Sequence, residues 1–93
     1  MIIFELLGFD VNLSGDFPTY FIFYKFKDEN KKTLSMKIDE LFGDKKVSEK
    51  YSSSILEGTN LLVVESLEKL DEESINKLTE LEFVNEVKFA DKL

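Results

Sequence analysis

The stretch "LLVVESLEKLDEESINKLTELEFVNEVKFA", residues 61–90, decides the fold because it predicts a strand, a helix and a second strand in that order. The run at 61–65 is short and mostly apolar, which is typical of a central strand. After the helix, the chain enters a last strand through Phe83 and Val84, and its predicted inner face carries Val87 and Phe89. We therefore expect a β-α-β unit over residues 60–90.

The helix of this unit is the best-defined element of the sequence. Asp71 is a good N-cap, and two glutamates follow it in the first turn, where the helix dipole favours negative charge. Leu70 and Ile75 stand at the N′ and N4 positions of a hydrophobic staple. The predicted buried stripe of this helix consists of Ile75, Leu78 and Leu81.

A second stretch, "FPTYFIFYKFK" at residues 17–27, combines aromatic rings with lysines. It predicts a strand over residues 19–27 with two different faces. The face under the helices is expected to carry Tyr20, Ile22, Tyr24 and Phe26. The other face then carries Phe21 and Phe23, which are a candidate protein interface if they are exposed in the single chain. The alternative is that both rings belong to the core.

Residues 2–13 predict a further strand, which we expect to pair with the strand at 19–27 through a turn at 14–18. Its apolar side chains alternate with polar ones, as in a half-buried strand. The parity of the alternation reverses at Leu6-Leu7-Gly8, which suggests a β-bulge.

Two segments in the middle of the chain are ambiguous. Residues 33–42 alternate like a strand, but their apolar side chains also fall at helical spacing. We favour the helix, because Thr33 can cap its start and Gly43 sits at the C′ position. The segment at 45–58 permits either a short helix ending at Gly58 or an irregular strand.

The order of elements predicts an α+β fold in a single domain, residues 1–93. After the N-terminal strand the order is βαββαβ, which is that of a ferredoxin-like two-layer sandwich. In this fold an antiparallel sheet carries two helices on one face. The strand at 2–13 is an extra strand outside this pattern.

The composition argues against several kinds of chemistry. The chain has no Cys, His, Trp, Arg or Gln. It therefore lacks thiolate nucleophiles, disulfides, the usual zinc ligands and a histidine general base. Its paired carboxylates fall mostly at predicted turns and helix ends, where capping and solvation explain them. We expect no catalytic residue, no cofactor and no metal site, and hence no enzyme.

The net charge of −7 is unevenly distributed. Residues 51–93 hold ten acidic side chains against four lysines. Such a surface suits a partner protein with a basic surface, although solubility alone is the other explanation. A second copy of the chain is also a possible partner, for the rings. The candidate partner-binding residues are Phe21, Phe23, Glu65, Glu68, Asp71, Glu72, Glu73, Glu80, Glu82 and Glu86.

Nucleic acid and membranes are not expected as partners. Rings beside lysines also occur in RNA-recognition sheets, but the central strand at 61–65 lacks the second aromatic motif of such a sheet. The domain is also acidic and has no arginine. No apolar run reaches the roughly 18 residues that span a bilayer, and the N-terminus does not read as a signal peptide. We expect a cytoplasmic protein, in the host cytoplasm if a phage encodes it.

Three segments resemble the subtilisin-propeptide family of protease inhibitors. "LDEESINKLTELEFVNEVKFADK" (70–92) is similar to the closing helix and strand of that family, with Val84, Val87 and Asp91 at its motif positions. The other two segments, which resemble its first and second strands, are "YFIFYKFK" (20–27) and "GDKKVSEKY" (43–51). The closing strand is also similar to that of ACT regulatory domains.

These resemblances imply the ferredoxin-like fold more than an activity. In the propeptide family the C-terminal tail lies in the protease cleft, which would implicate "KFADKL" (88–93). The N-terminal strand and residues 57–60 depart from the propeptide pattern.

By size, charge and lack of catalytic groups, the chain is similar to phage anti-CRISPR proteins, toxin-immunity proteins and antitoxins. Proteins of these classes cover a basic, nucleic-acid-binding or catalytic surface of another protein. Our leading hypothesis is therefore a non-catalytic acidic protein-binding module of this inhibitor type. The alternatives are a propeptide-like inhibitor of a subtilisin-type protease and an ACT-like regulatory domain.

Overall fold

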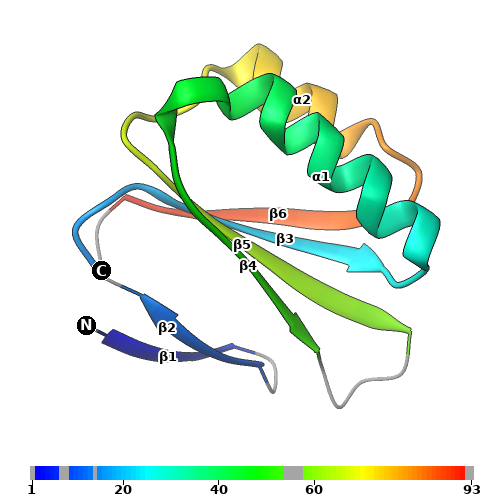
Figure 1. Ribbon diagram of the computed structural model, residues 1–93, viewed down its shortest axis with the longest axis horizontal. Coiled ribbons are helices and arrows are strands. Elements are labelled where there is room, and N and C mark those ends of the chain that lie inside the picture. Colours follow the sequence, from blue (N-terminus) through cyan, green and yellow to red (C-terminus); the bar gives the residue numbers. More distant parts are fainter. Residues whose placement is uncertain (1, 7–8, 14, 54–57, 92–93) are drawn as a thin grey trace.

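An antiparallel four-stranded sheet carries two helices on one face, and a separate two-stranded hairpin lies on the opposite side (Figure 1). The computed structural model describes residues 2–6, 9–13, 15–53 and 58–91. The elements along the chain are β1 (Ile2–Leu6), β2 (Phe9–Leu13), β3 (Thr19–Lys25), α1 (Asp28–Phe42), the short 3₁₀ helix η1 (Gly43–Lys45), β4 (Lys46–Ser53), β5 (Thr59–Ser66), α2 (Glu72–Thr79) and β6 (Val84–Ala90).

The strand order in the larger sheet is β4-β5-β3-β6, and all neighbouring strands are antiparallel. β5 and β3 are therefore the two central strands. This agrees with the central strand predicted from the apolar run at residues 61–65. The predicted α+β class is confirmed. No helix among the described residues is both long enough and apolar enough to cross a membrane.

The N-terminal segment differs from the single strand predicted over residues 2–13. β1 and β2 pair with each other, with Ile2 opposite Leu13 and Leu6 opposite Phe9. β3 pairs with β5 and β6, so the predicted pairing between β3 and the N-terminal strand is wrong. The reversal of apolar parity falls where the chain passes from β1 to β2. The predicted bulge includes residues 7 and 8, which lie outside the described residues.

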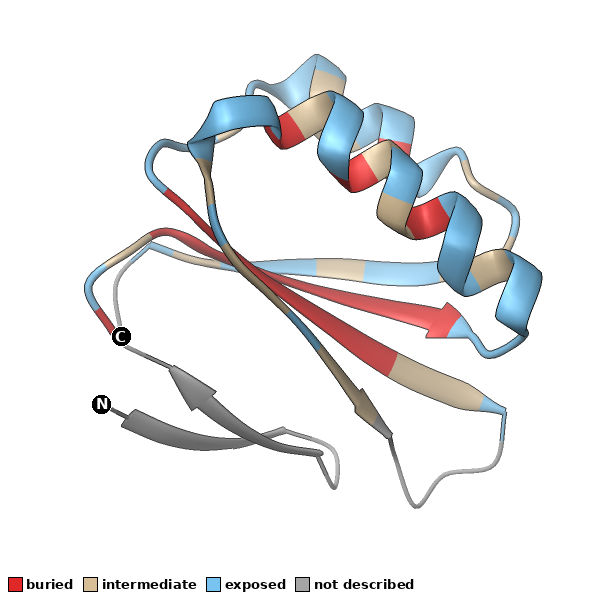
Figure 2. Ribbon diagram, viewed as in Figure 1, coloured by how far each residue is buried: buried red, intermediate tan, exposed pale blue. Residues whose placement is uncertain are grey.

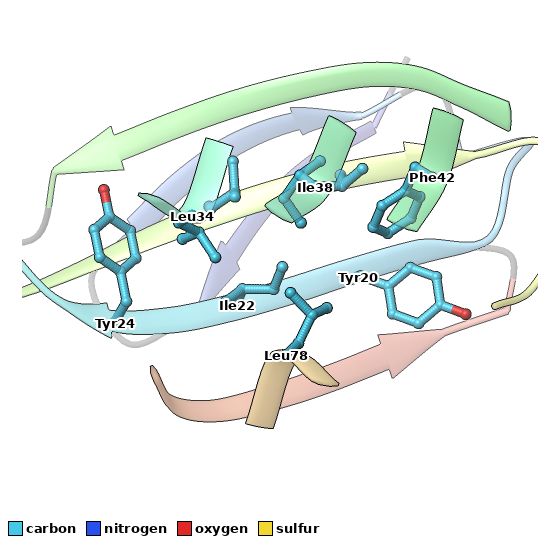
Figure 3. Packing of buried hydrophobic residues seen from close by; sticks show 9 residues of the cluster. Tyr20, Ile22, Tyr24, Leu34, Ile38, Phe42 and Leu78 are labelled. Atoms are coloured by element: carbon cyan, nitrogen blue, oxygen red, sulfur yellow. The ribbon is translucent and has the colours of Figure 1, made fainter. Parts of the chain in front are cut away.

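The helix-facing side of β3 builds the main core. Figure 3 shows Tyr20, Ile22 and Tyr24 pointing toward side chains from both helices, and all of these residues are buried. The helix side chains in this core are Leu34, Ile38 and Phe42 of α1 and Leu78 of α2. Phe26 does not join them, contrary to the prediction. It is 44% exposed because β3 ends at Lys25 and the chain turns toward α1.

α1 confirms the predicted helix over residues 33–42 but begins earlier, at Asp28. Thr33 is therefore inside the helix and does not cap it. Asp28 and Glu29 lie in the first turn, where negative charge is stabilised by the helix dipole. Gly43 follows the last helical residue with a φ of 53°, a conformation that glycine adopts without steric cost.

The ambiguous segment that follows forms a strand over residues 46–53, so a helix ending at Gly58 is wrong there. α2 begins as predicted, because the Asp71 side chain accepts a hydrogen bond from the Ser74 backbone N–H at 2.8 Å. Leu70 and Ile75, the predicted staple, both pack against the main core. Figure 2 shows that the helix surfaces turned away from the sheet are largely exposed.

Candidate partner-binding surface

Phe21 and Phe23 are buried in the single chain, so the prediction that they form an exposed interface is wrong. They are 3% and 4% exposed and form a second core with Leu61 and Val63 of β5. This core lies on the face of the sheet opposite the helices. The β1–β2 hairpin lies on that side, and β2 contacts the edge strand β4 (Figure 1). Both rings are therefore covered within the single chain and are not exposed to a partner.

Glu65 is also buried, which corrects the prediction that its side chain faces a partner. It is 3% exposed, near the end of the central strand β5, with Thr19 and Ser48 as its neighbours across the sheet. Its carboxylate accepts a hydrogen bond from the Ser48 hydroxyl at 2.7 Å. A buried carboxylate is tolerated when hydrogen bonds replace its water, so this acid belongs to the interior.

Three of the predicted acids are exposed but have partners within the chain. Glu68 forms an ion pair with Lys45 at 3.1 Å, and Glu86 lies 3.7 Å from the ammonium group of Lys88. Asp71 caps α2, and its hydrogen bonds from Ser74 hold the pKa of this carboxyl below its usual range. These acids carry charge at the surface, and each also has a structural role.

The remaining four acids are exposed. In the part of the chain that the structure describes, no lysine pairs with any of them. Three of them belong to α2 or its C-terminal cap, and the fourth lies in the loop between α2 and β6. We call this set the α2 acidic face; its members are Glu72, Glu73, Glu80 and Glu82.

The helical period places Glu72, Glu73 and Glu80 on one side of α2, while Glu82 lies beyond the end of the helix. Glu72, Asn76 and Glu80 are spaced at i, i+4 and i+8, so they follow one line along the helix surface. A rise of about 1.5 Å per residue separates the first and last of them by about 12 Å along the axis. Leu78 points the other way, into the core. The packed side of α2 thus fixes the direction of its acidic side.

Helix stability explains only part of this charge. Glu72 and Glu73 lie in the first turn of α2, where the helix dipole stabilises them. Glu80 is the C-cap, where the dipole disfavours an acid and where Lys77 is the only basic residue of the last turn. A residue that destabilises the local structure around it, with no contact that compensates, is often kept for function.

A second polar cluster, which no sequence pattern indicated, lies between α1 and β4. The carboxylate of Glu49, whose side chain is 13% exposed, is its centre. It accepts hydrogen bonds from Ser35 at 3.2 Å, Tyr51 at 2.7 Å and Lys46 at 2.9 Å. Lys46 also reaches Asp39 at 2.7 Å. These contacts join α1 to the edge of the sheet.

The hydroxyl of Tyr51 in this cluster is a weaker acid than that of an ordinary tyrosine. Its burial raises the pKa, and its hydrogen bond to Glu49 adds to the shift. A hollow of about 420 Å³ beside it is lined by Asp28, Lys31, Lys32, Ser35 and Tyr51. Lys31 lies over the Tyr51 ring, with its ammonium nitrogen 4.7 Å from the ring centre. Glu49 is already satisfied by three donors, so the cluster is best explained as a structural link.

Apart from Asp71, which caps α2, the predicted acids that are exposed and have no ion-pair partner among the described residues are those of the α2 acidic face. Of the ten predicted residues, the structure brings Glu72, Glu73, Glu80 and Glu82 to this surface and buries Phe21, Phe23 and Glu65. No group of three or more acidic side chains placed to hold a metal ion occurs among the described residues. Comparison with protein-family models, curated proteins and solved structures found no match to this chain.

Proposed function

We propose that the protein is a non-catalytic acidic binding module, of the inhibitor type represented by anti-CRISPR, immunity and antitoxin proteins. It uses the α2 acidic face to cover a basic nucleic-acid-binding or catalytic surface of a partner protein. The observation that carries the proposal is the position of Glu80. This acid is exposed, unpaired among the described residues and located where the dipole of α2 disfavours it.

The electrostatics of the free acids suit this role. A group of like charges steers a basic partner toward the surface and suppresses wrong partners, while it contributes less to the affinity itself. The attraction is screened beyond about 8 Å at physiological ionic strength, so binding depends on salt. The acids on α2 also need little reorganisation to bind, because Leu78 and Ile75 anchor this helix in the main core.

We also infer that residues 19–90 form a ferredoxin-like sandwich, to which the chain adds an N-terminal hairpin. The element order β3-α1-β4-β5-α2-β6, the strand order β4-β5-β3-β6 and the position of both helices on one face support this inference. In this arrangement α2 lies over the side of the sheet that ends in β6, since α2 and β6 are in contact. The fold thus presents one side of α2 to solvent.

The proposal is tested with the native partner, captured from the cell or phage host that makes the protein. Its affinity is measured for the wild type and for the triple variant Glu72→Lys, Glu73→Lys, Glu80→Lys, each at low and high salt. We expect at least about a tenfold loss of affinity in the variant and a weaker dependence on salt.

A matched control has the same change in charge elsewhere. Asp39→Lys, Glu40→Lys and Asp44→Lys reverse three exposed acids in α1 and η1. This control is expected to retain most of the affinity. Equal losses in the two triple variants, or an affinity that ignores salt, would contradict the proposal.

A further inference from the structure

β6 is an edge strand of the four-stranded sheet. It lies at one end of the strand order, and no other described strand pairs with its outer side. At the other end of the order, β4 is contacted by β2. An edge strand presents free backbone N–H and C=O groups that can pair with another chain. Proteins usually protect such an edge with charged side chains, so the charges of β6 decide whether it can pair.

The charges of β6 alternate in sign on one face. Glu86 lies opposite Phe23 of β3, and Lys88 lies opposite Phe21, so both are on the sheet face away from the helices. Their side chains are 49% and 48% exposed. A strand whose charges all have one sign repels a second copy of itself in every register. A strand with one acid and one base two positions apart does not.

One antiparallel register makes these charges complementary. If two copies of β6 pair about a twofold axis at Val87, Glu86 of each copy faces Lys88 of the other, which gives two opposite-charge pairs. If the axis passes through Glu86 or through Lys88, two like charges face each other across the axis. The charge pattern therefore selects a single symmetric register among these neighbouring ones.

The helix-facing side of β6 is also suited to this contact. Phe89 is 41% exposed, and its ring packs on Tyr20 with 4.8 Å between the ring centres. A hollow of about 200 Å³ beside it is lined by Tyr20, Lys69, Leu70, Ile75, Val87 and Phe89. In the register centred on Val87, the two Val87 side chains face each other at this apolar edge. Apolar area left partly open in the single chain is then covered.

From the alternating charge and the open edge, we propose that two copies of this chain associate through antiparallel pairing of β6 with β6, centred on Val87. Their four-stranded sheets become one continuous sheet, and the two α2 helices lie on the same face of it. This self-association is independent of the acidic-partner proposal. Because a single pair of strands makes a small interface, we expect a dissociation constant between about 1 µM and about 1 mM.

The test is sedimentation equilibrium of the purified full chain over a range of concentrations up to about 1 mM. The wild type is expected to dimerise. The variants Glu86→Lys and Lys88→Glu are expected to associate at least about tenfold more weakly, because in each of them positions 86 and 88 of the two copies then face each other with like charges. An equimolar mixture of the two variants is expected to form a heterodimer, since every facing pair then joins a lysine of one chain to a glutamate of the other. The double variant E86K/K88E is expected to dimerise like the wild type.

Two matched controls change the net charge in the same way away from the edge. Asp44→Lys and Lys32→Glu, both at exposed positions, are expected to dimerise like the wild type. Circular dichroism and thermal unfolding check that each variant is folded. A wild type that stays monomeric up to about 1 mM would overturn the proposal. So would a dimer that is insensitive to both single reversals, or two single variants that fail to associate when mixed.

Discussion

The backbone N–H of Leu70 donates a hydrogen bond of 2.8 Å to the hydroxyl of Tyr20, which lies 50 residues earlier in the chain. Tyr20 belongs to the central strand β3, and Leu70 is the residue before the N-cap of α2. The bond therefore joins the interior of the sheet to the point where α2 begins. It fixes the entry of the helix that carries the acidic face.

Replacing Tyr20 with Phe removes this bond and leaves the Leu70 N–H without its acceptor. We expect the free energy of unfolding in urea to fall by about 0.5–1.5 kcal/mol, the net contribution of one hydrogen bond, because Leu70 is only partly buried. Tyr24→Phe is the matched control. The Tyr24 hydroxyl is buried near Asn60, but it forms no well-aligned hydrogen bond among the described residues. A loss in Tyr24→Phe as large as in Tyr20→Phe would contradict this explanation.

The second core, formed by the two rings of β3 with Leu61 and Val63, predicts a large loss of stability when one of its rings is truncated. Phe23→Ala is expected to lower the free energy of unfolding by about 3–5 kcal/mol, because it leaves a cavity in a packed cluster. Phe26→Ala, just after the same strand, is the control and is expected to cost much less, since Phe26 is 44% exposed. Similar small losses in both variants, measured by denaturant unfolding, would mean that Phe23 is not buried in solution.

The tyrosines predict a loss of stability at alkaline pH. Burial raises the pKa of Tyr20, Tyr24 and Tyr51 above the usual 10.0, so the folded chain holds these protons more tightly than the unfolded chain does. Their contribution to stability is complete below pH 10.0 and is lost as the pH rises above it, because the unfolded state ionises first. Urea unfolding across this range measures the decline. Tyr51→Phe is expected to make the free energy of unfolding fall less steeply with pH. An unchanged slope in this variant would contradict the contribution assigned to Tyr51.

The N-cap of α2 predicts a contrast between two substitutions of Asp71. Asp71→Ala removes the acceptor of the Ser74 N–H and is expected to lower the melting temperature by about 4–8 °C, the shift typical of losing one cap in a domain of this size. Asp71→Asn keeps an acceptor at the same position and is expected to retain most of the stability. The low pKa of Asp71 means that its contribution is present at neutral pH and is lost as the pH falls. If Asp71→Ala melts at the same temperature as the wild type, the cap does not stabilise the chain.

Local signals in the sequence were enough to predict α2 and β5. The signals for α2 are the cap Asp71 and the staple of Leu70 and Ile75, which lie at the start of this helix. The signal for β5 is the apolar run at 61–65, which lies within the strand itself. The N-terminal hairpin could not be distinguished from one long strand, because a reversal of apolar parity is expected both at a bulge and at a turn between two strands.

The candidate surface was predicted only in part, because burial depends on distant segments. Glu65 has the same charge as its exposed neighbours along the chain, and only its place on a central strand buries it. The burial of Phe21 depends on the place of β3 between β5 and β6 in the sheet. The Glu49 cluster brings together side chains of α1 and β4, so no short motif could indicate it.

The central claim is that the acids of α2 serve a partner and not the fold, and Glu80→Gln tests it most directly. The substitution removes one charge from the end of α2 where the dipole disfavours it, so the free protein is expected to melt at the same or a slightly higher temperature. The decisive measurement is the affinity of this variant for the captured native partner at low salt. We expect it to be several-fold weaker than that of the wild type, as for the loss of one charge contact. An unchanged affinity would contradict the claim.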